Sequence, residues 1–214
     1  MNSHLIVTSE ILLTVVLPLL IVYLKSDTPL GTKIGCLLVI PPLWYLTYSP
    51  LHELSHVLGT YLVGGTVTYI KLIPRFWVGE FGRAWITPEG LRHDWQWLTM
   101  TSLPYVLDMI CIVVGGRVLR RRMPGNPFIA GLVFMLLLLR PLFDLVCETV
   151  AFASGQRGDF YHMQLRLGGG AMWLLIAMAI AASLHATMSV VGRRPGRAAR
   201  RRGQAPLEPA PPLA

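Results

Sequence analysis

The chain has 214 residues, of which 53% are hydrophobic and only 14% are charged. A soluble globular domain carries about 25% charged residues, so the composition argues against a soluble protein and, with apolar residues gathered in long runs, favours a membrane protein. The net charge of +8 lies largely in two short arginine clusters beside apolar runs. Such clusters are typical of membrane topology signals rather than of a nucleic-acid-binding face, so nucleic acid is not an expected partner.

Five apolar segments are expected to cross the lipid bilayer, at residues 5–24, 34–63, 96–116, 128–153 and 170–191. Each reaches the roughly 20 residues that a spanning helix needs. The first lacks a basic segment before it, so no cleavable signal peptide is expected. The second is longer than necessary and contains Pro41, Pro42 and Pro50, which predict a kink or a division into two helices, with Pro50 opening the second.

Residues 64–90, between the second and third segments, are rich in Thr, Val, Tyr, Ile, Phe and Trp and are broken by Gly and Pro. This pattern predicts a short β-hairpin or ribbon. Residues 193–214 are rich in Arg, Pro and Ala without periodicity, which predicts a disordered tail. The expected fold is an all-α polytopic membrane protein, with residues 1–192 forming a single membrane-embedded domain.

Lysine and arginine residues are distributed unevenly between the two expected sides of the membrane. With five spans, 12 of them fall on the side of the C-terminal tail and 6 on the side of residues 64–90. The positive-inside rule then predicts a multi-pass protein of the cell membrane with a cytoplasmic C-terminal tail and an external N-terminus.

The sequence HELSH, residues 52–56, lies inside the second apolar segment. His52 and His56 are four residues apart, so on a helix both imidazoles share one face and can reach one metal ion. A zinc ion bound in this way lowers the pKa of its water towards about 7, and Glu53 is placed to take the proton. A polar seam between packed helices is the alternative, but such a seam would not require this spacing.

Catalytic zinc normally has three protein ligands, so a third is expected on another segment. Asp144, within RPLFDL, is the preferred candidate, and Asp108 and Glu148 remain alternatives. Arg140, Asp144 and Glu148 follow one another at intervals of four residues on one helix face, which also predicts a ladder of ion pairs. Pro141 is expected to kink this helix near the carboxylate.

HELSH, the strand-like residues 64–90 and RPLFDL two segments later together resemble the site-2 protease family of intramembrane zinc metalloproteases (M50 type). The resemblance implies a zinc endopeptidase that cleaves transmembrane segments, with His52, His56 and Asp144 as Zn²⁺ ligands and Glu53 as general base. The glycine that usually follows the family's aspartate is absent here, as is a PDZ module, so a minimal core is expected. The resemblance also implies a cytoplasmic β-rich loop, opposite to the charge count, and the orientation stays open.

Two other functions remain as alternatives: a catalytically inactive pseudoprotease that binds transmembrane partners, and a metal-handling membrane protein. A transporter would be expected to carry further ligands along a path, and the other spans are poor in them. RGDF, residues 157–160, is expected to be a short connection. Isolated histidines and cysteines are expected to be surface or packing residues: His4, His93, His162, His185, Cys36, Cys111 and Cys147.

Overall fold

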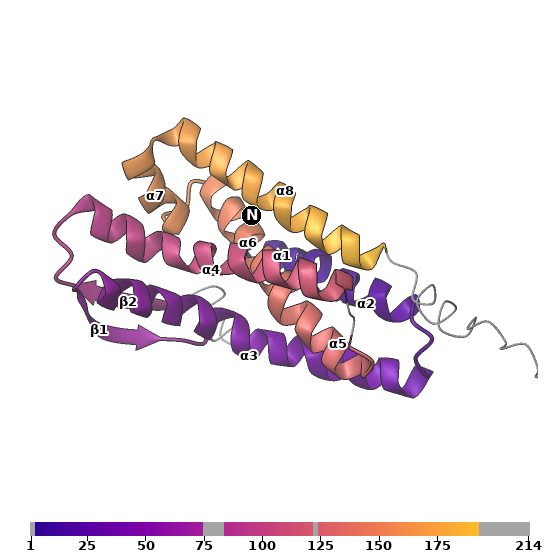
Figure 1. The fold of residues 1–214 in the computed structure, drawn as a ribbon. Helices are drawn as coiled ribbons and strands as arrows, with labels where there is room; N and C mark the ends of the chain where they lie inside the picture. The colour runs from indigo at the N-terminus through magenta and orange to yellow at the C-terminus, as the bar shows by residue number, and fades with distance from the viewer. Residues whose placement is uncertain (1–2, 75–83, 122–123, 193–214) are drawn as a thin grey trace, which may run out of the picture.

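The computed structural model describes residues 3–74, 84–121 and 124–192. It is an elongated bundle of helices with a small two-stranded sheet at one end (Figure 1). Four helices are long and apolar enough to cross a membrane: α3 (Leu30–Leu62), α4 (Asp94–Arg121), the continuous run Pro127–Ala153, and α8 (Gly169–Val191). The run Pro127–Ala153 consists of α5 (Pro127–Phe134), a π-helical turn (Met135–Leu139) and α6 (Arg140–Ala153).

The first apolar segment differs from the four others. It forms α1 (Ser3–Ile11), a π-helical turn (Leu12–Val16) and α2 (Leu17–Leu24), but its apolar part, Thr8–Leu24, is shorter than a full span. Both π-turns lie just before a proline, Pro18 or Pro141, whose missing N–H removes a helical hydrogen bond. The described chain thus has four full-length apolar helices where the sequence predicted about five.

The predicted division of the second segment is wrong. Helix α3 runs without interruption from Leu30 to Leu62 and contains all three prolines, so Pro50 does not begin a helix. Neighbouring helices can hold a proline-containing helix together by packing. Here Trp44 is buried and lies edge-on to Phe143 of α6, with ring centroids 4.8 Å apart. At 1.5 Å per residue α3 is about 50 Å long, longer than the roughly 30 Å hydrocarbon core of a bilayer.

The predicted β-hairpin is confirmed between α3 and α4. Strands β1 (Thr66–Lys71) and β2 (Trp85–Glu89) pair antiparallel, with Thr66 opposite Glu89 and Lys71 opposite Trp85. The pairing is irregular between Val67 and Tyr69, where the register shifts. Residues 75–83 of the predicted hairpin and the predicted disordered tail, residues 193–214, lie outside the described residues.

The topology brings several chain reversals to the end of the bundle that carries the hairpin (Figure 1). The end of α3, the start of α4, the end of α6, the short helix α7 (Asp159–Leu167) and the start of α8 meet there. The opposite end carries the start of α3, the end of α4 and the end of α8, where Lys25 Nζ donates to the Val191 carbonyl at 3.0 Å. Segments far apart in sequence therefore meet at the hairpin end.

Helices α3 and α4 lie in close contact at Gly59. A Cβ atom at this position would lie 2.9 Å from the Met100 Cα of α4. No side chain fits in such a gap without moving a backbone. Gly59 is one helical turn beyond His56, so this contact also sets the distance between His56 and α4.

Replacing Gly59 with valine is expected to force α3 and α4 apart. Overpacking of this kind costs about 1–3 kcal/mol, so the apparent melting temperature in detergent should fall. Gly35→Val, on the same helix with nothing within 4 Å of its Cβ position, is the matched control. Equal melting temperatures for the two variants would contradict this account of the contact.

Candidate metal centre

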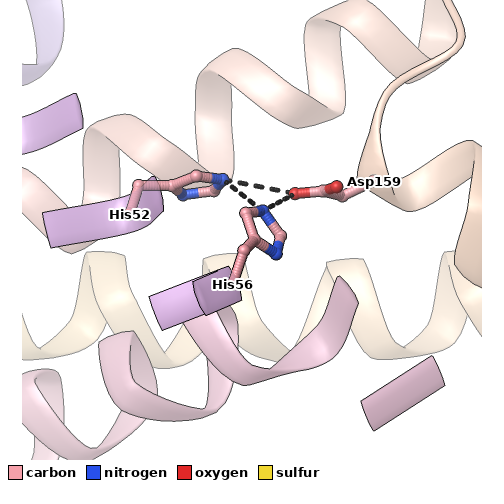
Figure 2. Close-up of side chains that lie close together, drawn as sticks. All are labelled: His52, His56 and Asp159. Carbon is pink, nitrogen blue, oxygen red and sulfur yellow. Dashed lines mark hydrogen bonds and ion pairs between the residues drawn. The ribbon is translucent and has the colours of Figure 1, made fainter. Parts of the chain in front are cut away.

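Three side chains converge at the hairpin end of the bundle: His52 and His56 of α3, and Asp159 of α7 (Figure 2). His52 Nε2 and His56 Nε2 lie 3.1 Å apart. Asp159 Oδ2 lies 3.2 Å from His52 Nε2 and 2.9 Å from His56 Nε2. The three atoms form a nearly equilateral triangle, and this group could hold a metal ion.

The hydrogen bond of His56 determines which of its nitrogens faces the triangle as a lone pair. His56 Nδ1 lies 2.9 Å from the Met100 carbonyl oxygen of α4. A carbonyl can only accept, so Nδ1 carries the proton and donates it. Nε2 of a neutral imidazole is then an unprotonated acceptor. Metal-bound histidines usually hold their second nitrogen in this way.

His52 is backed by a carboxylate on its far side. Its Nδ1 lies 3.7 Å from Asp144 Oδ2 of α6, beyond hydrogen-bond distance, and has no hydrogen-bond partner among the described residues. Asp144 in turn accepts a 3.0 Å bond from Arg140, whose other terminal nitrogen pairs with the buried Asp108 of α4. Asp144 therefore lies behind His52, the side from which a carboxylate within hydrogen-bond distance would orient a ligating imidazole.

Asp159 is the first residue of α7, and it faces the two histidines from a segment other than theirs (Figure 2). Tyr105 Oη of α4 donates to Asp159 Oδ2 at 2.9 Å. Burial opposes ionisation of this carboxyl, but the neighbouring His56 and the hydrogen bonds from both histidines outweigh burial and lower its pKa. Asp159 is therefore an anion, the form in which a carboxylate binds a metal.

Nε2 of a neutral His56 is an acceptor, as is the ionised Oδ2 of Asp159, and Nε2 of His52 completes the group. The Tyr105 proton serves only the aspartate. In the absence of a metal, a proton on a histidine Nε2 can donate to Asp159 and hold the three atoms together. A metal ion would take the place of that proton, since the group offers two imidazole nitrogens and a carboxylate oxygen within 3.2 Å of one another.

A cavity of about 420 Å³ reaches this triangle. Its wall includes Glu53, which is buried with 7% of its surface exposed, and Glu148 of α6. Strand β2 supplies Trp85, Ile86 and Pro88 to the same wall lining. The candidate ligands, a carboxylate beside them and an extended strand therefore share one cavity.

The centre lies close to one end of the apolar region. The stretch of α4 from Trp97 to Arg117 rises about 30 Å, which matches the hydrocarbon thickness of a bilayer. Met100 and Tyr105, which contact the centre, lie roughly 5 and 12 Å along the helix from Trp97. A centre at this depth can be reached by water from the hairpin end.

The structure brings the predicted residues His52, Glu53 and His56 to the cavity wall together with Asp144. The oxygen that completes the triangle belongs to Asp159, which the sequence placed in a short connection. The ligand role of Asp144 stays a prediction. Of its two alternatives, Asp108 pairs with Arg140, and Glu148 accepts the Phe160 backbone N–H at 3.1 Å. The predicted ion ladder is thus formed between Arg140 and Asp144, while Glu148 bonds to α7.

Comparison with family models, with curated proteins and with solved structures finds no match for this chain. A functional assignment therefore depends on the chemistry of the side chains themselves.

Substitution of the two aspartates distinguishes a ligand from an orienting carboxylate. Asp159→Asn is expected to weaken metal binding more than 100-fold, because it removes an anionic donor. Asp144→Asn is expected to weaken it by about 10–100-fold, the usual effect of losing an outer partner of a ligating histidine. Competition with a chelating dye, on detergent-purified protein, measures both. Full metal affinity in Asp159→Asn with loss in Asp144→Asn would assign the third ligand to Asp144 instead.

Proposed function

We propose that this chain is an intramembrane zinc metalloendopeptidase of the site-2 protease type, which cleaves transmembrane segments of membrane-protein substrates. One observation carries the proposal: the cavity that holds the His52, His56 and Asp159 donors also holds Glu53, the residue directly after the first histidine. A buried carboxylate that can reach a metal-bound water is what hydrolysis requires of a general base.

The donor set favours zinc. Two imidazole nitrogens and one carboxylate oxygen are a common catalytic zinc combination that leaves a fourth position open. Tetrahedral bonds of about 2.0–2.1 Å place the donor atoms roughly 3.3–3.4 Å from one another. The three separations, 2.9–3.2 Å, are only slightly shorter.

In the proposed reaction, Zn²⁺ would supply a Lewis acid that polarises the substrate carbonyl and acidifies water. Glu53 accepts the proton of the attacking water as the new carbon–oxygen bond forms. It then passes this proton to the amide nitrogen as the carbon–nitrogen bond breaks, releasing an amine and a carboxylic acid. The Met100 carbonyl and Tyr105 hold His56 and Asp159 in place through the hydrogen bonds described above, and neither takes part in proton transfer.

Strand β2 suggests how the substrate is presented. A helical peptide bond is shielded by its own hydrogen bonds, so a transmembrane substrate must unwind locally before it is cleaved. Trp85, Ile86 and Pro88 line the cavity, and an extended substrate segment could pair with an edge of the β1–β2 sheet beside the metal. In this proposal the cleaved bond would lie near one membrane face, because the centre lies close to one end of the apolar region.

Glu53→Gln tests the proposed catalysis. It is expected to keep about one zinc per chain while slowing cleavage of a model transmembrane substrate by at least 10²–10⁴-fold, the usual contribution of general acid–base catalysis. Asp27→Asn, an exposed carboxylate at the opposite end of the bundle, is the control. Undiminished cleavage in Glu53→Gln would contradict the mechanism. A parent that binds zinc but cleaves nothing would favour a pseudoprotease or a metal-handling protein.

We further propose that the basic end of the bundle faces the cytoplasm, since Lys25, Lys33, Arg117, Arg120 and Arg121 lie at the end opposite the hairpin. Glu89→Cys, on β2, should then react with a membrane-impermeant maleimide in intact cells. Asp27→Cys should react only after permeabilisation. The parent chain controls for its own cysteines, and the reverse pattern would place the metal centre on the cytoplasmic side.

A further inference from the structure

Helix α7 supplies one of the three donors but lies outside the spanning helices. It has nine residues, Asp159–Leu167, and an isolated helix of this length is not stable in water. Its position must therefore come from contacts with the rest of the chain. Because Asp159 is its first residue, whatever holds the start of α7 also determines where the third donor lies.

Aromatic packing holds the N-terminus of α7 against the bundle. Phe160 is buried, with its ring centroid 4.7 Å from that of Tyr105 and 6.4 Å from that of Phe152. Apolar contacts of this kind are not directional. They keep α7 against the bundle but do not define the orientation of the peptide group between Asp159 and Phe160.

A carboxylate from another helix fixes the orientation of the peptide group between Asp159 and Phe160. The first N–H groups of a helix lack partners inside the helix and are usually capped by a side chain at the preceding position. In α7 that position is Gly158, which has no side chain and makes no cap bond. Glu148 Oε1 of α6 accepts the Phe160 N–H at 3.1 Å and takes the place of the missing cap.

The absence of a side chain at Gly158 makes room for the same contact. A Cβ atom built on Gly158 would collide with the Glu148 carboxylate. Glycine therefore leaves the space that the carboxylate occupies. A negative charge at this position is also favoured by the helix dipole of α7.

We propose that Glu148 is a positioning residue that caps α7 from outside and thereby holds Asp159 in the metal site. It accepts a hydrogen bond from the backbone and is neither a metal ligand nor a base. The inference rests on the metal site of the proposed function, but it does not depend on peptide cleavage.

Two substitutions of Glu148 separate these roles. Glu148→Gln keeps an acceptor oxygen of the same reach, so its zinc affinity should stay within about threefold of the parent. Glu148→Leu removes the acceptor, and its zinc affinity should fall by about 10–100-fold, as for other partners of a ligand. A loss in Glu148→Gln as large as in Glu148→Leu would indicate a ligand or charge role and overturn the proposal. So would parent-like affinity in Glu148→Leu.

A double-mutant cycle tests whether Gly158 and Glu148 act through one contact. Gly158→Ala should weaken zinc binding in the parent but have little further effect in Glu148→Ala, because the colliding carboxylate is gone. Gly170→Ala, with nothing within 4 Å of its Cβ position, is the control. Independent, additive losses would contradict the shared contact.

Hydrogen exchange in metal-free protein gives a readout that needs neither zinc nor cleavage. Amides at the start of α7 should exchange faster in Glu148→Leu than in the parent or Glu148→Gln, while α4 and α8 remain unchanged. Uniformly faster exchange would indicate general destabilisation and overturn the proposed local role. Failure of the parent to cleave substrate, with these differences intact, would refute the protease proposal alone.

Discussion

Ionisable side chains inside an apolar helical bundle need partners within the protein, since the hydrocarbon core contains no water to solvate them. In this chain the constraint is met by two adjoining groups. Arg140 pairs with both Asp108 and Asp144 in the interior, and Asp159 meets His52 and His56 nearer the hairpin end. The two groups adjoin where His52 Nδ1 lies 3.7 Å from Asp144 Oδ2. The interior ion pairs therefore lie directly beside a residue of the candidate metal centre.

The residues of the candidate metal centre come from two kinds of element: long, closely packed helices and one short helix. Helices α3, α4 and α6 are long and packed against one another, so they provide the two histidines, Glu53 and the outer partners of the histidines at well-defined positions. The third donor comes from α7, a short helix held by Phe160 and Glu148. Because α7 is only nine residues long and carries the third donor at its first residue, changes at its start would directly alter the geometry of the metal donors.

The sequence allowed much of the scaffold to be predicted because the relevant signals are local. Apolar runs of sufficient length indicated the spanning helices, and a stretch rich in β-branched and aromatic residues, broken by Gly and Pro, indicated the hairpin. Pro50 misled the prediction because a proline weakens a helix locally, whereas Trp44 and Phe143 stabilise α3 through packing that a local pattern cannot show. Glu148 was correctly singled out as an interior carboxylate, but its partner is a backbone N–H twelve residues away rather than Arg140.

The sequence by itself determined the histidine pair. Residues four apart on a helix share a face whatever surrounds them, so the spacing of His52 and His56 was sufficient to predict a common metal, with Glu53 beside it. Only the tertiary structure decided which carboxylate completes the triangle. Asp159 is 107 residues from His52 and begins a helix of only nine residues. Its approach depends on how α7 docks against α4 and α6, which is a long-range property that no local spacing encodes.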